Sequence, residues 1–306
     1  MEVEGHKYSL PASDLITDLN KLKHTSFDLA ILALKTYHLK DILPDLVRLK
    51  NSMPPILCLQ NGVESENILR EALGKNLVIP GTVTTAVDRI QKGNIIVRKS
   101  RGIGIAGDHP LIAGLILEFQ KAGLEPVHYT KPENMKWSKL ILNLLGNASS
   151  AILNMTAAEV YADPELFSME RTQILETLGI MKLLGYQTVN LPGVPVRLLA
   201  FVFKYFPRVL SQKILSGLIG GGRGEKMPSF HIDLHSGKGK SEVDHLNGAV
   251  NRAGTKLHFP TPVNNLLFDI LTSLTDGRES LNKYDHQPGV LLQAYSSRII
   301  PDTPET

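Results

Sequence analysis

The sequence predicts two domains, an α/β domain built on a mainly parallel sheet and an all-helical domain that follows it. Residues 1–130 alternate short apolar runs with helix-like segments, whereas strand-like runs nearly vanish after Lys131-Pro132. The length of 306 residues agrees with this division, because single hydrophobic cores rarely grow to such a size. We therefore expect domains at residues 1–130 and 131–306.

Short runs without polar alternation indicate the strands of the first domain, since a strand covered on both faces is apolar throughout. We expect a helix cap from Asp108, which precedes a helical pattern, and a helix end at Gly74. The expected strands are 29–34, 56–59, 77–79, 82–87, 95–97 and 103–105, and the expected helices are 41–50, 64–73 and 110–122.

Helical patterns continue through the second domain to about residue 284. The glycine-rich segment 220–224 favours a loop or hinge over a phosphate-binding turn. Ser241 and Asp244 have the spacing of a capping box at a helix start. We expect the tail from Gln287 onward to be irregular.

Composition excludes several classes of protein. The net charge of +3 is mild and the basic residues are scattered, so no nucleic-acid partner is expected. One cysteine, Cys58, excludes an intrachain disulfide and fits a reducing compartment. The N-terminus lacks the pattern of a signal peptide, and charges at Lys204 and Arg208 interrupt the longest apolar stretch, 198–219. We expect a cytoplasmic protein with no membrane partner, and the histidine spacing predicts no metal site.

Lys139, Asn143 and Asn147 follow one another in steps of four within an apolar segment, which places them on one stripe of a helix. Buried polar groups need partners. Two interpretations remain open from the residues alone. The segment is an interior helix whose asparagines bond neighbouring backbone, or it is a site in which Lys139 supplies a proton and the amides hold a substrate.

Lys35 and Asn61 each close a predicted strand. Ligands bind at the carboxyl ends of strands in open α/β sheets, although ordinary turn chemistry also explains both residues. The literal G-x-G-x-x-G at 102–107 lacks a buried strand before it, so a strand with glycines at its ends is favoured over a dinucleotide-binding turn. Glu242 has no structural assignment beyond a solvated first-turn acid.

These residues, in this order, resemble the ketopantoate reductase (2-dehydropantoate 2-reductase) family. The resemblance runs from residue 1 to about 275 and is carried by LALK at 32–35, NGVE at 61–64, GTVTTA at 81–86, KWSKLILNLLGN at 136–147, KMPS at 226–229, SEVDHLNGAV at 241–250 and PTPVN at 260–264. It implies a Rossmann NADP-binding domain, followed by a helical substrate and dimerisation domain like the C-terminal domain of 6-phosphogluconate dehydrogenase. It also implies reduction of 2-dehydropantoate to pantoate with NADPH, on the route to coenzyme A.

The resemblance also implies roles for individual residues. Lys139 looks like the catalytic lysine that protonates the carbonyl oxygen, a task that suits an ammonium group. The positions that match substrate-binding residues are Asn61, Asn143, Asn147 and Ser229, and those that match cofactor-binding residues are Lys35, Asn61 and Glu242.

Three departures from the family pattern bear on function. The family's first strand, glycine-rich turn, helix and second strand have no counterpart, which leaves a misplaced start, a shortened piece and a real loss as alternatives. Ala157 stands where the family often has another substrate-binding asparagine, and Asn154 is the nearby substitute. The helical domain also carries extra sequence at 191–224, and Ser229 and Glu242 are one residue farther apart than usual.

The leading hypothesis is therefore an NADPH-dependent reductase of ketopantoate type in which Lys139 is the proton donor. A reductase of a different 2-oxo acid is one alternative. The other is a non-catalytic remnant that serves as a binding or dimerisation module, because loss of the first βαβ unit would expose a strand edge. A homodimer through the helical domain is expected, whereas the choice between NADPH and NADH stays open.

Overall fold

The computed structural model describes residues 2–3, 6–7, 16–19, 26–91, 94–223, 227–237 and 239–299. The chain divides into two compact units, each described here by itself. The first unit comprises Met1–Lys136 and Val189–Pro195, and the second comprises Trp137–Thr188 and Val196–Thr306. The division falls inside helix α4 (Pro132–Leu144).

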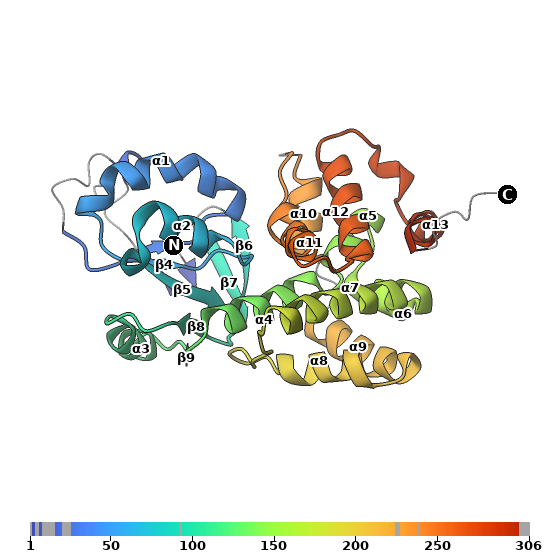
Figure 1. Cartoon of the computed structure of the whole chain (residues 1–306), viewed down its shortest axis with the longest axis horizontal. Coiled ribbons are helices and arrows are strands. Elements are labelled where there is room, and N and C mark those ends of the chain that lie inside the picture. The colour runs from blue at the N-terminus through green and yellow to red at the C-terminus, as the bar shows by residue number, and fades with distance from the viewer. Residues whose placement is uncertain are drawn as a thin grey trace. The chain divides into compact units, whose positions relative to one another are not determined.

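A five-stranded sheet forms the centre of the first unit, with the strand order β3-β4-β5-β8-β9 (Figure 1). Strands β3, β4 and β5 are parallel to one another, as are β8 and β9, while β5 and β8 are antiparallel. The prediction of a mainly parallel sheet is confirmed. The strands are β3 (Ala30–Leu32), β4 (Ile56–Cys58), β5 (Val78–Val83), β8 (Ile103–Ala106) and β9 (Pro126–Tyr129).

Each face of this sheet has its own hydrophobic core. Helices α1 (Leu39–Leu49) and α2 (Ser65–Leu73) contribute side chains to the core on one face, whereas α3 (Ile112–Lys121) packs on the other. Because both faces are covered, strand residues such as Leu57 and Ile79 are fully buried. This explains why the strands read as continuous apolar runs.

A second, four-stranded sheet has the order β2-β1-β7-β6. Its strands are β1 (Glu2–Val3), β2 (His6–Lys7), β6 (Ala86–Gln91) and β7 (Asn94–Lys99). The predicted strands at 77–79 and 82–87 are instead divided between β5 and β6. Strand β5 runs through Gly81, where a side chain would collide with Leu57 and Leu59 of the neighbouring strand region.

The glycine-rich segment at 102–107 forms strand β8, as the sequence favoured. Gly102 has a φ of +123°, and a β-carbon there would collide with the carbonyl of Glu125. The glycine therefore allows close approach of two backbone segments and opens no dinucleotide-binding helix.

The helix ends of the first unit partly follow the sequence. Gly74 ends α2 with a φ of +100°, as predicted. The predicted cap at Asp108 is wrong, because α3 begins only at Ile112 without a side-chain cap. The ring of His109 instead accepts the Leu111 N–H at 3.2 Å, so a local turn separates Asp108 from the helix.

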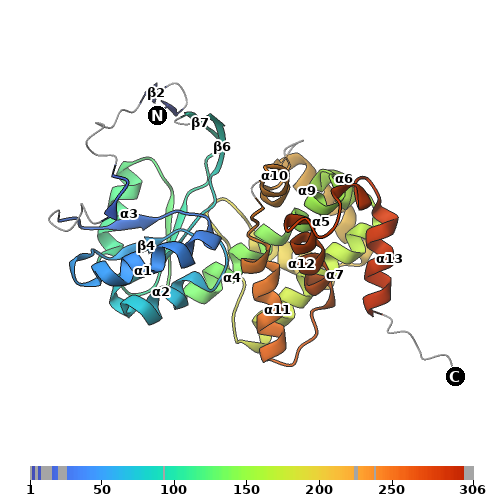
Figure 2. The same ribbon diagram turned by 90° about the horizontal axis from the view of Figure 1, so that it is seen from above.

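The described residues of the second unit form helices and connecting turns without a strand, and they are arranged around the long helix α7, with α8 and α9 on one side and α11 and α12 on the other (Figure 1). Figure 2 shows α12 between α11 and α13. Its helices are α5 (Asn147–Leu153), α6 (Ala157–Ala162), α7 (Pro164–Leu183), α8 (Val196–Tyr205), α9 (Arg208–Arg223), α10 (Ser229–His235), α11 (Asn247–Lys256), α12 (Pro262–Thr275) and α13 (Pro288–Ile299). In the described part of the chain, no helix has the length and hydrophobicity needed to cross a membrane.

Two predicted irregular segments are helical instead. Helix α9 continues through Gly220–Gly222, while Gly224 lies outside the described residues. The tail prediction is also wrong, because Pro288–Ile299 forms α13, which packs against α7 and α12 with Leu291 fully buried. Tertiary packing thus supplied the stability that the local pattern did not reveal. Residues 301–306 lie outside the described residues.

The predicted capping box at 241–244 is wrong as well. Ser241 Oγ accepts the Val243 N–H at 3.2 Å, which closes a local turn ahead of a short 3-10 helix, Val243–His245. Asp244 forms an ion pair with Arg252 at 2.6 Å. Helix α11 starts only at Asn247.

Candidate functional site

The structure places the predicted site residues in two groups, one in each unit. Lys35 and Asn61 belong to the first unit and follow the parallel neighbours β3 and β4. Both side chains are half-buried. The Thr36 hydroxyl, next to Lys35, donates to the Asn61 carbonyl oxygen at 3.0 Å. The structure therefore brings these two predicted residues to one edge of the sheet, as expected from their places at strand ends.

Gln60 holds this edge together from within. It is buried, and its Nε2 donates to the Leu34 carbonyl oxygen at 3.1 Å, which joins the ends of β3 and β4. Asn61 follows directly, and Gly62 takes a φ of +84° that favours glycine. The turn that presents Asn61 is thus fixed by a buried amide that the sequence pattern did not single out.

A buried ion pair lies under the same turn. Lys136 Nζ is 2.7 Å from Glu66 Oε1, and the two side chains are only 5% and 6% exposed. The ammonium also donates to the Gln60 carbonyl oxygen at 2.6 Å and contacts the Gly81 carbonyl oxygen at 3.4 Å. Lys136 therefore ties the carboxyl ends of β4 and β5 to the start of α4, where burial makes each charge depend on its partner.

Cys58 lies beside this pair at the end of β4. Its thiol is fully buried, and burial, followed by the charge of Glu66, raises its pKa to about 12. A thiol in this state is not a nucleophile at neutral pH. Cys58 is a core residue.

In the second unit, the predicted single polar stripe is interrupted. Helix α4 ends at Leu144, and Gly146 adopts a left-handed conformation with a φ of +60° before α5 starts at Asn147. A β-carbon at Gly146 would lie 3.0 Å from Ala157 Cβ. Lys139 and Asn143 share α4, while Asn147 begins a separate helix.

Glu170 of helix α7 fixes this break. Its carboxylate is fully buried and accepts the Gly146 N–H at 2.8 Å, the Ser149 hydroxyl at 2.5 Å and the Tyr161 hydroxyl at 3.3 Å. These donors satisfy a buried carboxylate that would otherwise be costly. The α4–α5 turn is consequently held by a residue that lies more than twenty positions downstream.

Asn147 and Ser229 come together as the resemblance implies. Asn147 is 5% exposed, its Nδ2 donates to Ser229 Oγ at 3.3 Å, and its Oδ1 accepts the Phe230 N–H at 3.0 Å. The same Nδ2 donates to the Asn143 carbonyl oxygen at 2.9 Å. Ser229 itself is exposed at the first position of α10. The asparagine thereby links α4, α5 and α10.

Lys139 and the Asn143 side chain lie on α4 and are half-buried. Lys139 stands one helical turn after Lys136 and one turn before Asn143, so successive turns of α4 carry the structural and the predicted catalytic lysine. An ammonium on a half-buried helix face can protonate a carbonyl oxygen placed against it.

Glu242 and Asn154 lie in surroundings that the sequence pattern did not predict. Glu242 is 2% exposed, so the description as a solvated first-turn acid is wrong. Asn154 Oδ1 contacts His231 Nε2 at 2.7 Å, and its Nδ2 donates to Asp285 Oδ1 at 3.0 Å. Asn154 thus supports helix α10, while Ala157 is a buried residue of α6.

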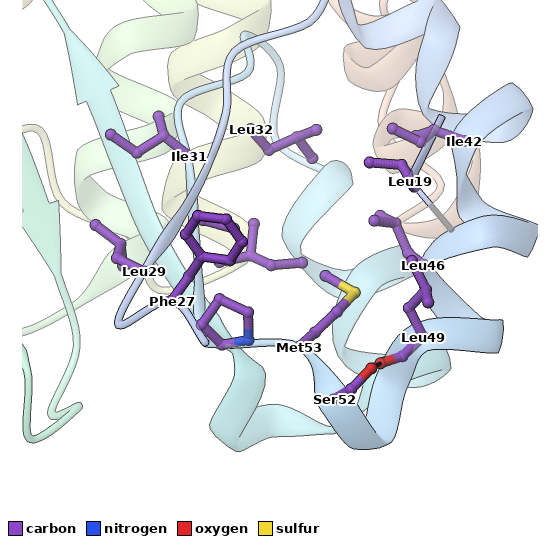
Figure 3. Close-up of a pocket in the computed structure, with 13 residues that line it drawn as sticks. Leu19, Phe27, Leu29, Ile31, Leu32, Ile42, Leu46, Leu49, Ser52 and Met53 are labelled. Atoms are coloured by element: carbon purple, nitrogen blue, oxygen red, sulfur yellow. Dashed lines mark hydrogen bonds between the residues drawn. The ribbon is translucent and has the colours of Figure 1, made fainter. Parts of the chain in front are cut away.

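One cavity of about 320 Å³ lies in the first unit (Figure 3). Figure 3 shows side chains of α1 on one side and those around β3 on the other, and no lining residue is titratable. It includes Phe27, which precedes β3, and Met53, which precedes β4, so it lies toward the amino ends of these strands. The cavity is therefore separate from the Lys35–Asn61 edge and provides no acid–base group.

Comparison with known proteins gives concordant results. The profile described as ketopantoate reductase PanE/ApbA matches residues 5–109, and that of ketopantoate reductase PanE/ApbA C terminal matches residues 132–275. A 2-dehydropantoate 2-reductase of Pyrococcus horikoshii is 26% identical over 262 residues, covering 83% of this chain and 76% of that protein.

Solved structures show the same fold at lower identity. D-mandelate dehydrogenase in complex with NADH has a TM-score of 0.68 at 19% identity, over 83% of this chain and 80% of the other. A dimeric ketopantoate reductase of Staphylococcus aureus has a TM-score of 0.64 at 18% identity, over 83% and 79% of the two chains. These likenesses confirm the expected combination of a Rossmann-like domain with a helical C-terminal domain.

Proposed function

Because the chain belongs to the ketopantoate reductase PanE/ApbA family of oxidoreductases, we propose that it reduces 2-dehydropantoate to pantoate with NADPH. The observation that supports this best is the joint presence, in one unit, of Lys139 on α4 and the hydrogen-bonded pair of Asn147 and Ser229. A cation and neutral donors are the groups that a 2-oxo acid needs for its carbonyl oxygen and its carboxylate.

The residues at the sheet edge fit a nicotinamide nucleotide. Lys35 offers a cation for phosphate, and Asn61 offers an amide in a turn that Gln60 and Lys136 hold in place. Ligands of this kind bind at the carboxyl ends of parallel strands. The proposed choice of NADPH over NADH rests on the family resemblance and not on a residue of this edge. When bound, the nucleotide supplies the hydride that reduces the carbonyl carbon.

Lys139 supplies the second part of the reaction. As the carbonyl carbon receives a hydride, negative charge develops on its oxygen, and an adjacent ammonium both stabilises that charge and donates the proton that completes the hydroxyl group. Asn143, one turn farther along α4, is proposed to hold the substrate, and buried Glu242 is proposed to contact the cofactor.

The decisive experiment is replacement of Lys139 by alanine. The variant should lose about two to four orders of magnitude in turnover of 2-dehydropantoate, because the proton donor is gone, while its melting temperature stays close to that of the wild type. Turnover by the variant that matches the wild type would refute the proposal. A panel of 2-oxo acids measured in parallel separates the ketopantoate activity from that of a related reductase.

A second candidate, a binding module without catalysis, is favoured by one observation. Strand β3 ends the described five-stranded sheet, Ile31 within it is 53% exposed, and the flanking residues Phe27 and Leu34 are 47% and 43% exposed. Titration of NADPH fluorescence decides between the two, since saturable binding at micromolar concentration excludes the module and the absence of binding excludes the reductase.

We further propose a homodimer through the helical unit. Helices α8 and α9 expose large apolar side chains, among them Leu198, Phe201 and Tyr205, which are 50% to 62% exposed. Exposed groups of this kind mark protein interfaces. Sedimentation velocity should give the dimer mass for the wild type and the monomer mass for Phe201→Glu.

A further inference from the structure

We propose that the Lys136 ammonium is an internal cation around which the loop between β4 and α2 folds, and that it thereby positions Asn61 for the nucleotide. The inference rests on the proposed function, in which Asn61 contacts the cofactor. It adds a positioning residue that neither the sequence pattern nor the family resemblance singled out. It also gives Lys136 and its partner Glu66 separable roles.

The ammonium contacts this loop at both of its ends. Lys136 Nζ donates at 2.6 Å to the carbonyl oxygen of Gln60, the residue directly before Asn61. At the other end, Nζ lies 2.7 Å from Oε1 of Glu66, in the first turn of α2. A third contact, at 3.4 Å, is the Gly81 carbonyl oxygen in β5. The chain therefore passes around one buried cation between the end of β4 and the start of α2, and Asn61 lies within that passage.

The position of the ammonium is set by the sheet and not by the loop. Met135, the preceding residue on α4, is fully buried, and a β-carbon at Gly104 of β8 would lie 2.9 Å from Met135 Sδ. The first turn of α4 is therefore packed closely against β8. The Lys136 side chain is 5% exposed, so it acts through the loop and does not itself contact a ligand.

Gln60 extends the effect to the second predicted cofactor residue. Its backbone carbonyl binds the ammonium, while its side-chain Nε2 donates to the Leu34 carbonyl oxygen at 3.1 Å and contacts that of Lys35 at 3.5 Å. A displacement of Gln60 would therefore disturb the backbone at Lys35 as well as at Asn61. The contacts of Lys136 thus support both predicted nucleotide contacts of this sheet edge.

Glu66 balances the buried charge without contacting the Gln60 carbonyl. Removal of one member of a buried ion pair leaves an uncompensated charge, whereas removal of both charges together is often neutral for stability. Stability should therefore follow the balance of charge, while the position of Asn61 should follow the presence of Lys136 Nζ. A purely structural pair would make nucleotide affinity follow stability instead.

The test compares Lys136→Met, Glu66→Gln and the double variant Lys136→Met/Glu66→Met by NADPH fluorescence titration, urea denaturation and hydrogen exchange. Lys136→Met should raise the Kd for NADPH about tenfold, the size of one net hydrogen bond, and speed exchange in the β4–α2 loop. Glu66→Gln keeps the ammonium and an acceptor for it, so Kd should stay within about threefold although the urea midpoint falls. The double variant should regain most of the midpoint and keep the roughly tenfold loss of affinity.

Two further measurements separate positioning from general damage. Lys121→Met removes a cation from an exposed ion pair on α3 and should leave Kd within about twofold of the wild type. In the catalytic assay, the KM for NADPH should rise in both variants that lack Lys136. Turnover at saturating NADPH should change much less, because the proposed proton donor Lys139 is retained.

Several outcomes would overturn the inference. One is a double variant that binds NADPH as the wild type does, since affinity would then follow stability. Others are a Glu66→Gln variant that loses as much affinity as Lys136→Met, and loop exchange that is unchanged without Lys136. If Lys136→Met does not fold, the double variant is read in its place, and failure of both to fold makes Lys136 purely structural. A wild type that does not bind NADPH fails the proposed function, and loop exchange then decides the positioning role alone.

Discussion

The two groups of predicted site residues are held in place in opposite ways. At the sheet edge, Lys35 and Asn61 are half-buried, and other residues, namely Gln60, Lys136 and Glu66, fix the turns that carry them. In the helical unit, the predicted site residue Asn147 itself makes the structural contacts, because its side chain joins α5 to α10. A polar residue at a predicted functional position can therefore also hold helices together, as the hydrogen bonds of Asn147 to Ser229 and Phe230 do.

The strongest way to break the sheet-edge arrangement is Lys136→Met. It leaves Glu66 buried without its cation, and we expect a loss of about 3–5 kcal/mol in the free energy of unfolding. Urea denaturation measures the loss. The exposed pair of Lys121 and Glu118 is the control, since Lys121→Met should cost at most about 1 kcal/mol. Equal losses in both variants would contradict the structural role of Lys136.

Glu170→Gln tests the hydrogen bonds that hold the α4–α5 turn in place. The carboxylate accepts three hydrogen bonds in the core, and an amide cannot reproduce them all, so unfolding should become easier by about 1–3 kcal/mol. Glu165→Gln is the control on the same helix, because Glu165 is exposed and should change stability by less than about 0.5 kcal/mol. Thermal unfolding of the three proteins gives the comparison.

Gly146→Ala tests the backbone of the same turn. A β-carbon in the left-handed region costs roughly 1–2 kcal/mol, and contact with Ala157 at 3.0 Å adds to it. Gly217→Ala in helix α9 should instead raise the stability of the protein. No atom lies within 4 Å of the added β-carbon, and alanine favours a helix over glycine by about 0.5–1 kcal/mol. Opposite shifts of the denaturation midpoints are expected, and shifts of the same sign would count against the left-handed turn.

The last prediction concerns the pH dependence of stability and helix α10. Burial, followed by the nearby His235, lowers the pKa of His231 to about 4 from its ordinary 6.5. The unfolded chain therefore binds a proton more readily than the folded one between these values, and stability is lost as pH falls from 6.5 to 4. Unfolding measured across this range should show less pH dependence in His231→Gln than in the wild type. An unchanged profile would exclude His231 as the cause.

Much of the fold was predictable because it depends on local patterns. The apolar runs around Leu57 and Ile79 gave the parallel strands, since both faces of that sheet are covered. Helix α13 was missed because its stability comes from packing of Leu291 and its neighbours against α7 and α12. The break at Gly146 was missed because a glycine inside a helical sequence pattern does not by itself indicate a left-handed turn.

The sequence predicted which residues belong to the candidate site, but not which hydrogen bonds and ion pairs hold that site together. The spacing of Lys139, Asn143 and Asn147 indicated a polar stripe, and their roles in catalysis and binding stay proposals. Lys136 was overlooked although it lies in the same motif, because a charged residue is normally taken as solvated unless a partner is known. Its partner Glu66 lies seventy residues earlier, and no spacing rule connects them.

The sequence by itself determined the two-domain order, the mainly parallel sheet and the family, because these follow from periodicity and from motifs that are read along the chain. Only the tertiary structure decided that Lys136 and Glu66 are a buried pair, that Glu170 fixes the α4–α5 turn, and that Asn147 donates to Ser229. The physical reason is that a hydrogen bond or ion pair depends on atoms that the fold brings within about 3 Å, whatever their separation in the chain.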